Sequence, residues 1–153
     1  MTKRITAALL ALCLALALAD CGKGSEPELN IDELGEELYA AGTFGETLYP
    51  LDESVAQGLY GTDADTRCWV RAGPGATAEE LAVFETQDAD AAAALVKKLE
   101  TRNADRIESD SSYMPAEVPE LESAVIRCGG RYVVRCVAED ASAGREAAEK
   151  ALG

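Results

Sequence analysis

Residues 124–137 read Ala-Val-Ile-Arg-Cys-Gly-Gly-Arg-Tyr-Val-Val-Arg-Cys-Val. Two runs rich in valine, isoleucine and tyrosine flank Gly129-Gly130, a pair that tolerates the positive φ angles of a two-residue β-turn. We therefore predict a β-hairpin whose strands cover residues 124–128 and 131–137. Its presence indicates that the chain contains an antiparallel sheet.

A further strand is expected at residues 66–72, where the side chains alternate in character and Cys68 and Val70 share the more apolar face. Residues 77–86 allow two structures. Thr77-Ala-Glu-Glu matches a capping box that starts a helix, whereas the run from Leu81 to Phe84 suits a buried strand.

Four segments carry the apolar periodicity or the capping residues of helices. They are residues 31–41 (N-capped by Asn30), 53–60 (burying Val55 and Leu59), 88–108 (capped by Asp88) and 141–152. The third helix is apolar only as far as Leu99, and Asn103 and Arg106 continue the same face. We expect its C-terminal half to project more freely from the domain.

The segment Gly75-Ala-Thr-Ala-Glu-Glu-Leu-Ala-Val-Phe84 resembles the central motif of a bacterial lipoprotein family known as domain of unknown function 4358. Shorter matches lie at Leu59-Tyr-Gly61, Tyr113-Met-Pro115 and Gly130-Arg-Tyr-Val133. The resemblance covers most of residues 30–140 and implies that residues 80–86 form a strand. It also implies a lipoprotein of Gram-positive-type bacteria. The family has no assigned activity, so no catalytic residue is carried over to this chain.

With that strand, the expected fold class is α+β. We predict a single small domain over residues 30–153, in which helices pack on an antiparallel sheet of about four strands. A signal peptide precedes this domain.

The N-terminal segment resembles a bacterial lipoprotein signal. Lys3 and Arg4 precede an apolar run of 15 residues, which is shorter than the roughly 20 needed to span a bilayer. The run ends at Leu18-Ala-Asp-Cys-Gly22, which is similar to a lipobox and implies that the Cys21 thiol receives a diacylglyceryl group. We expect residues 1–20 to be a signal peptide and residues 21–29 to be the lipidated cysteine and a flexible tether.

Asp20 departs from the lipobox pattern, because the residue before the cysteine is normally Gly, Ala or Ser. Ala17-Leu-Ala19 also matches an ordinary signal-peptidase site, and cleavage after Ala19 would release a soluble secreted protein. The position of Cys21 at the end of the apolar run favours lipidation.

The composition excludes several classes of protein. After residue 20 the chain carries 12 basic and 27 acidic residues, a net charge of −15 that disfavours nucleic acid as a partner. The chain has no histidine, the commonest general base and metal ligand. Asp63 with Asp65 and Asp88 with Asp90 begin like calcium loops but lack the Gly and distal Glu that follow in such loops. We therefore predict no metal site and no cofactor.

Three cysteines remain in the expected domain: Cys68, Cys128 and Cys136. In the predicted hairpin Cys128 faces Arg131 and Cys136 faces Ser123, so the two thiols lie on opposite faces and too far apart to form a disulfide. Either thiol could pair with Cys68. The three are expected to be buried free thiols, with one structural disulfide as the alternative, and the absence of a C-x-x-C motif argues against redox catalysis.

Arginines gather on the predicted strands. Outward-facing Arg67, Trp69 and Arg71, together with Arg131 and Arg135, would make a basic sheet face suited to an anionic ligand or a partner protein. The alternative is that these arginines pair with the surplus carboxylates. Arg127 lies on the apolar side of the hairpin and fits neither interpretation.

The sequence favours a non-catalytic binding or scaffolding domain, lipid-anchored at the extracytoplasmic face of the cell membrane. Its expected partners are the membrane, through Cys21, and an envelope protein or an anionic ligand. The alternative is an envelope enzyme with a carboxylate- or thiol-based site.

Overall fold

The computed structural model describes residues 28–153, which form the predicted α+β domain. The expected signal peptide and the lipidation at Cys21 lie outside these residues, as does all but the last part of the expected tether. The sheet has five strands, all antiparallel, in the order β1-β2-β3-β5-β4. They are β1 (Tyr49–Pro50), β2 (Arg67–Ala72), β3 (Glu80–Glu85), β4 (Val125–Gly129) and β5 (Tyr132–Val137). The additional strand is β1, which has only two residues and no periodicity to reveal it.

The hairpin is present, with its turn one residue later than predicted. Gly129 pairs with Tyr132, so the turn residues are Gly130 and Arg131. Gly130 has a φ of 53°, and no residue other than glycine has a positive φ in the described part of the chain. A positive φ at the first turn residue alone is the pattern of a type II′ turn. One glycine therefore suffices, and Gly129 continues the strand.

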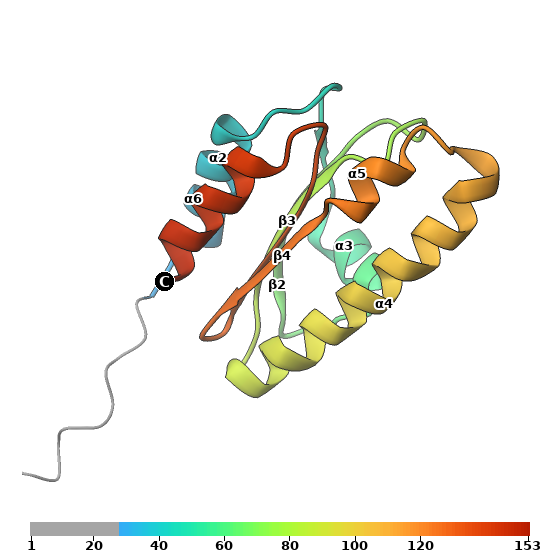
Figure 1. Cartoon of the computed structure of the whole chain (residues 1–153). Helices are drawn as coiled ribbons and strands as arrows, with labels where there is room; N and C mark the ends of the chain where they lie inside the picture. The colour runs from blue at the N-terminus through green and yellow to red at the C-terminus, as the bar shows by residue number, and fades with distance from the viewer. Residues whose placement is uncertain (1–27) are drawn as a thin grey trace, which may run out of the picture.

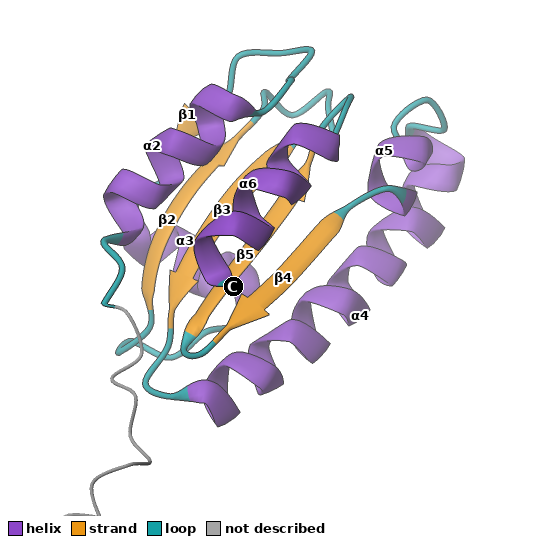
Figure 2. Ribbon diagram, turned by 60° about the vertical axis from the view of Figure 1, so that its left-hand side comes forward, coloured by secondary structure: helices purple, strands orange, loops and turns teal. Residues whose placement is uncertain are grey.

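Helices cover both faces of the sheet (Figures 1 and 2). On one face lie α2 (Ile31–Ala41) and α6 (Ser142–Leu152). On the other lie α3 (Glu53–Tyr60), the long α4 (Ala89–Tyr113) and the short α5 (Val118–Glu122). The domain thus has three layers, and neither sheet face is open to solvent as a whole.

The layer beneath α2 and α6 is the larger apolar core. Leu81, Val83, Val134 and Cys136 project from β3 and β5 toward α2 residues such as Leu38. The Asn30 side chain accepts from the backbone N–H groups of Asp32 and Glu33 at 3.0 and 3.4 Å, which confirms the predicted N-cap of α2. The 3.6-residue periodicity of α2 and the two-residue periodicity of β5 therefore predicted their buried sides correctly.

The opposite core is built on Phe84 of β3, which is fully buried, with Leu95 and Leu99 of α4 packed near it. Here α3 contributes Ala56 and Tyr60, not the predicted Val55 and Leu59, which are 53% and 41% exposed. The helix is turned so that the Tyr60 ring meets Phe84 edge-on, with ring centroids 5.0 Å apart. Burial of the larger aromatic ring decides the orientation of α3.

The C-terminal half of α4 is attached to the domain, contrary to the prediction. The helix continues to Tyr113, and Asp110 in its last turns is buried. Asn103 donates to the backbone oxygen of Leu121 in α5 at 2.8 Å. Polar contacts replace apolar packing beyond Leu99, which is why hydrophobic periodicity did not reveal this attachment.

Candidate functional site

A buried carboxylate lies at the start of β3. Glu80 is 4% exposed and faces α3 and α4, like Ala82 and Phe84 further along the strand. Its Oε1 accepts from the Tyr60 hydroxyl at 2.8 Å and from Arg135, and its Oε2 accepts from Arg106 Nη1 at 2.9 Å. Glu80 thereby joins α3, α4 and β5. Burial and the neighbouring Glu80 charge raise the pKa of Tyr60 well above its usual value, so the phenol stays protonated and donates.

Arg135 is fully buried, so the prediction that it faces outward is wrong. The strand alternation had placed it correctly on the face opposite Val134 and Cys136, but α4 covers that face. Besides pairing with Glu80, Arg135 donates through Nη2 to Asn103 Oδ1 at 2.8 Å. Burial lowers the pKa of Arg135, and the nearby Arg106 and Arg102 charges lower it further.

A cavity of about 450 Å³ lies beside this cluster, between the C-terminal end of α3 and the second half of α4. We call it the α3/α4 cavity. It is lined by Gly58, Leu59, Tyr60, Gly61, Arg102, Asp105, Arg106, Ser109 and Asp110. It is widely open to solvent, and its volume falls within the roughly 300–1,000 Å³ of small-molecule sites.

Two arginines one turn apart on α4 line this cavity. The Arg102 guanidinium lies 5.2 Å from the centroid of the Tyr60 ring, and its buried Nε has no hydrogen-bond partner. Arg106 is tied to Glu80 and lies 3.9 Å from the carboxylate of Asp110. The site therefore combines one fixed guanidinium with a second that is stacked on an aromatic ring.

The remaining arginines of the predicted basic surface each form an ion pair with a carboxylate. Arg67 pairs with Asp32 at 3.2 Å, Arg71 with Glu36 at 2.8 Å and Arg131 with Glu85 at 2.8 Å. Trp69 was predicted to face outward, but its side chain is half-buried because α2 lies against it. A Cβ on Gly35 would come within 2.2 Å of the Trp69 ring. This finding corrects the expectation of an open basic face, and it agrees with the alternative of pairing with carboxylates.

Arg127, which fitted neither interpretation, contacts α6. Its Nη2 donates to Glu149 Oε1 at 2.9 Å, and its Nη1 donates to the backbone oxygen of Ile126 at 3.0 Å. The side chain therefore crosses the edge of the apolar layer to reach a helical carboxylate.

Cys68 and Cys136 are buried free thiols. Burial raises the pKa of both, that of Cys136 to about 11. Cys128 is exposed, not buried as expected. It lies opposite Val133, and Cys136 lies opposite Val125. The predicted partners, Arg131 and Ser123, were wrong by two residues because the turn is shifted. The conclusion that Cys128 and Cys136 point to opposite faces stands, because the shift is an even number of residues.

Sequence reasoning missed the paired glutamates of the central motif, which it read as part of a capping box. Glu79 is 2% exposed and accepts from the backbone N–H groups of Gly45, Glu46 and Glu139 at 2.7, 2.8 and 3.1 Å. It ties the loop after α2 to the end of β5. The two glutamates directly before a buried strand were a signal of this arrangement, because a carboxylate that is buried with the strand requires hydrogen-bond partners.

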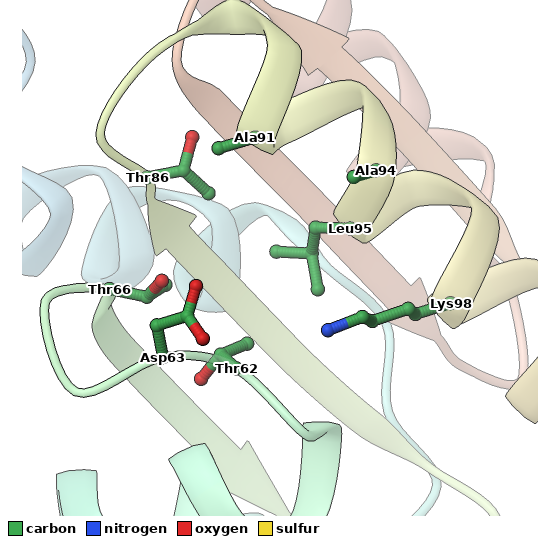
Figure 3. A pocket seen from close by; sticks show the side chains of 8 residues that line it. All are labelled: Thr62, Asp63, Thr66, Thr86, Ala91, Ala94, Leu95 and Lys98. Atoms are coloured by element: carbon green, nitrogen blue, oxygen red, sulfur yellow. The ribbon is translucent and has the colours of Figure 1, made fainter.

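A smaller polar cavity of about 90 Å³ lies between the loop after α3 and the first half of α4 (Figure 3). Asp63 and Lys98 point into it from opposite sides (Figure 3). Lys98 Nζ donates to the backbone oxygen of Gly61 at 2.8 Å. This cavity has room for a few water molecules but not for an organic ligand.

Within residues 28–153 no group of side chains could hold a metal ion, and no helix is long and apolar enough to cross a bilayer. The family model described as "Domain of unknown function (DUF4358)" matches residues 48–138. The chain therefore belongs to this family. No curated protein and no solved structure matches it significantly.

The family match includes β1 to β5, and with them Glu80, Arg135 and the α4 arginines. It excludes α2 and α6, which cover the other face of the sheet. The candidate site thus lies inside the segment that defines the family.

Proposed function

We propose that this protein is a non-catalytic binding domain, anchored at the extracytoplasmic face of the cell membrane by a lipid on Cys21. Residues 1–20 act as the signal peptide, and residues 21–29 connect the anchor to the domain. The observation that carries the binding role is the α3/α4 cavity, which has the size of a ligand site and side chains fixed by a buried ion-pair cluster. Fixed side chains bind a ligand with little loss of conformational entropy.

The chemistry of the buried groups favours binding over catalysis. Thiols whose pKa is raised by burial are poor nucleophiles at neutral pH, which applies to Cys68 and Cys136. Both carboxylate oxygens of Glu80 accept hydrogen bonds from other side chains of the protein, so Glu80 serves to hold those side chains in place. A carboxylate- or thiol-based enzyme is therefore the weaker alternative.

The chain direction is consistent with attachment at one end of the domain. The Leu29 N–H donates to the Tyr132 hydroxyl at 2.9 Å, beside the turn of the β4–β5 hairpin. From there α2 runs over the sheet face opposite α3 and α4 (Figure 2). The described chain thus begins on the sheet face opposite the α3/α4 cavity.

The anchor is tested by expressing the full chain in a bacterial host and separating the membrane and soluble fractions. We expect the wild-type chain in the membrane fraction, with a diacylglyceryl adduct on Cys21 in its intact mass. Cys21→Ala should be lost from that fraction, whereas Cys13→Ala, a matched change inside the signal, should behave as wild type. A mature N-terminus with a free Asp20 amine would contradict the anchor and support a soluble secreted protein.

The binding role is tested with a variant that fills the cavity. Gly58 lines the cavity, and a Cβ there meets no atom within 4 Å, so the chain has room for a larger side chain at this position, and Gly58→Leu is designed to fill the site. Gly75→Leu is the control, because a Cβ on Gly75 also meets no atom within 4 Å and Gly75 does not line the cavity. Small molecules bound to protein purified from envelope extracts would be compared by mass spectrometry. The proposal requires a ligand that Gly58→Leu loses and Gly75→Leu retains.

A further inference from the structure

Arg102 is a cation without an anionic partner in a strongly acidic protein. It forms no ion pair with any carboxylate of residues 28–153, although Arg67, Arg71, Arg106, Arg127, Arg131 and Arg135 each form at least one. Its recorded contact is the face of the Tyr60 ring. An aromatic ring orients a guanidinium but does not neutralise its charge. Arg102 therefore places on the wall of the α3/α4 cavity a guanidinium that no carboxylate of residues 28–153 pairs with directly.

The acidic and basic side chains that line the cavity are equal in number, but they are not all paired with one another. Arg106 and Arg135 both pair with the buried carboxylate of Glu80. Asp110 lies beside Arg106, at 3.9 Å. The remaining acidic group, Asp105, is exposed at the rim, where solvent weakens its field. An anion that enters the cavity meets the Arg102 guanidinium, which has no carboxylate of residues 28–153 within ion-pair distance.

The lining also limits which anion fits. Arginine presents planar pairs of N–H donors that match a carboxylate or a phosphate. Leu59, which is 41% exposed, forms an apolar part of the wall, and Ser109 adds a hydroxyl. The wall is thus suited to a small molecule with one oxyanion group and an apolar part.

We propose that the α3/α4 cavity binds a small ligand through an oxyanion group, a carboxylate or a phosphate, with Arg102 as its principal contact. This proposal rests on the binding role proposed above and specifies its ligand class. Tyr60 holds the Arg102 guanidinium from behind, and the Glu80 cluster fixes both Tyr60 and Arg106. The buried charges of this cluster thereby position the groups that meet the ligand.

The probes are inorganic phosphate, benzoate and neutral benzamide, titrated calorimetrically into the full chain purified in detergent at constant ionic strength. We expect saturable binding of phosphate or benzoate and none of benzamide, which has the shape of benzoate without its charge. Binding of benzoate but not phosphate identifies a carboxylate ligand, and the reverse identifies a phosphate. Failure of both oxyanions to bind, or equal binding of benzamide, would overturn the proposal.

Three variants locate the site. Arg102→Gln removes the charge and should weaken oxyanion binding about tenfold or more, the effect of losing a charged hydrogen bond. Arg145→Gln makes the same change on an exposed part of α6, on the other sheet face, and should leave binding unchanged. Asp105→Asn removes the negative charge at the rim and should tighten binding several-fold. Equal affinities in wild type and Arg102→Gln would refute Arg102 as the contact.

These outcomes are separable from the test of the proposed function. If Gly58→Leu abolishes recovery of an envelope ligand but no oxyanion binds, the binding role stands and the ligand class is wrong. If phosphate or benzoate binds with the expected dependence on Arg102 but Gly58→Leu leaves the recovered ligand unchanged, the oxyanion site stands and the envelope ligand binds elsewhere.

Discussion

At the scale of single residues, Glu80 has the most connections in the candidate site. It accepts from Tyr60, Arg106 and Arg135, which come from three separate elements, and it is the only carboxylate paired with the fully buried Arg135 in the described chain. A buried ion pair adds little net stability relative to apolar residues, but removal of one partner leaves the other charge uncompensated. Glu80 is therefore needed to compensate the buried charges of the arginines that pair with it.

This argument predicts a large loss of stability in Glu80→Ala, about 3–5 kcal/mol in the free energy of unfolding. Urea denaturation followed by the fluorescence of Trp69, the sole tryptophan, measures the change. The control is Glu149→Ala, which breaks the exposed pair with Arg127 and should cost about 0–1 kcal/mol. If Glu80→Ala does not fold, Glu80→Gln keeps the shape and can be measured. A loss no larger than that of the control would show that Arg135 is not dependent on Glu80.

The buried thiol of Cys136 predicts how the stability of the domain changes with pH. Burial raises its pKa in the folded state from the ordinary 9 to about 11, so between these values the folded chain binds more protons than the unfolded chain. Its contribution to stability is then fully present below pH 9 and is lost as the pH rises to about 11, with a slope of at most about 1.4 kcal/mol per pH unit. Tyr60 titrates with the same sign at higher pH, because its pKa is also raised.

The difference between wild type and Cys136→Ala isolates the thiol from the other groups. Urea denaturation at a series of pH values should show a steeper decline for wild type than for the variant across this window. Parallel declines would mean that the folded and unfolded thiols titrate alike.

At the scale of elements, the contact between α2 and β2 depends on one glycine. A Cβ on Gly35 would lie 2.2–2.5 Å from three atoms of the Trp69 indole, so α2 packs on the ring only because no side chain intervenes. Arg71 stacks on the same indole at 5.5 Å from its centroid and pairs with Glu36 of α2. The helix, the ring and the arginine therefore form one packed unit.

We expect Gly35→Ala to destabilise the domain by about 1–3 kcal/mol, the usual cost of overpacking, even though alanine is the better helix former. Gly58→Ala in α3 is the matched control, because its Cβ meets no atom within 4 Å and it should stabilise by about 0.5–1 kcal/mol. The Trp69 emission maximum gives a second measurement, since displacement of α2 exposes the indole. Equal effects of the two substitutions would contradict the close packing.

The elements also show where sequence patterns are informative. The cap at Asn30, the hairpin around Gly129-Gly130 and the helix after Asp88 are local signals, and the structure contains each of them, with the turn of the hairpin one residue later than predicted. The two-residue strand β1 and the orientation of α3 depend on contacts with distant residues, Ala72 and Phe84 respectively. Such contacts leave no periodicity in the segment itself, so these features could not be predicted.

At the scale of the whole molecule, the predicted arginine surface was wrong because the sheet has helices on both faces. Alternation along a strand separates its two faces but does not say which is exposed, and Arg135 faces a layer that is itself buried. The candidate site joins Tyr60, Glu80, Arg106 and Arg135, which are brought together only by the sheet register and the packing of α3 and α4. Besides the glutamates at the start of β3, the visible sign in the sequence was the presence of Asn103 and Arg106 on the apolar face of α4, which was interpreted as the end of packing.

The net charge of −14 predicts how the thermal stability of the whole fold depends on salt concentration. Surplus carboxylates repel one another in the compact state, and salt screens this repulsion, whereas the buried Glu80 cluster is screened much less. Raising sodium chloride from about 10 mM to about 500 mM should therefore raise Tm, by roughly 2–4 °C for each kcal/mol gained. Chloride is used because phosphate is a proposed ligand of the α3/α4 cavity and would raise Tm by binding. Circular dichroism at increasing salt measures the effect, and Arg145→Gln, which adds to the negative surplus, should show a larger rise. A fall in Tm would mean that exposed pairs such as Arg67–Asp32 and Arg71–Glu36 outweigh the repulsion.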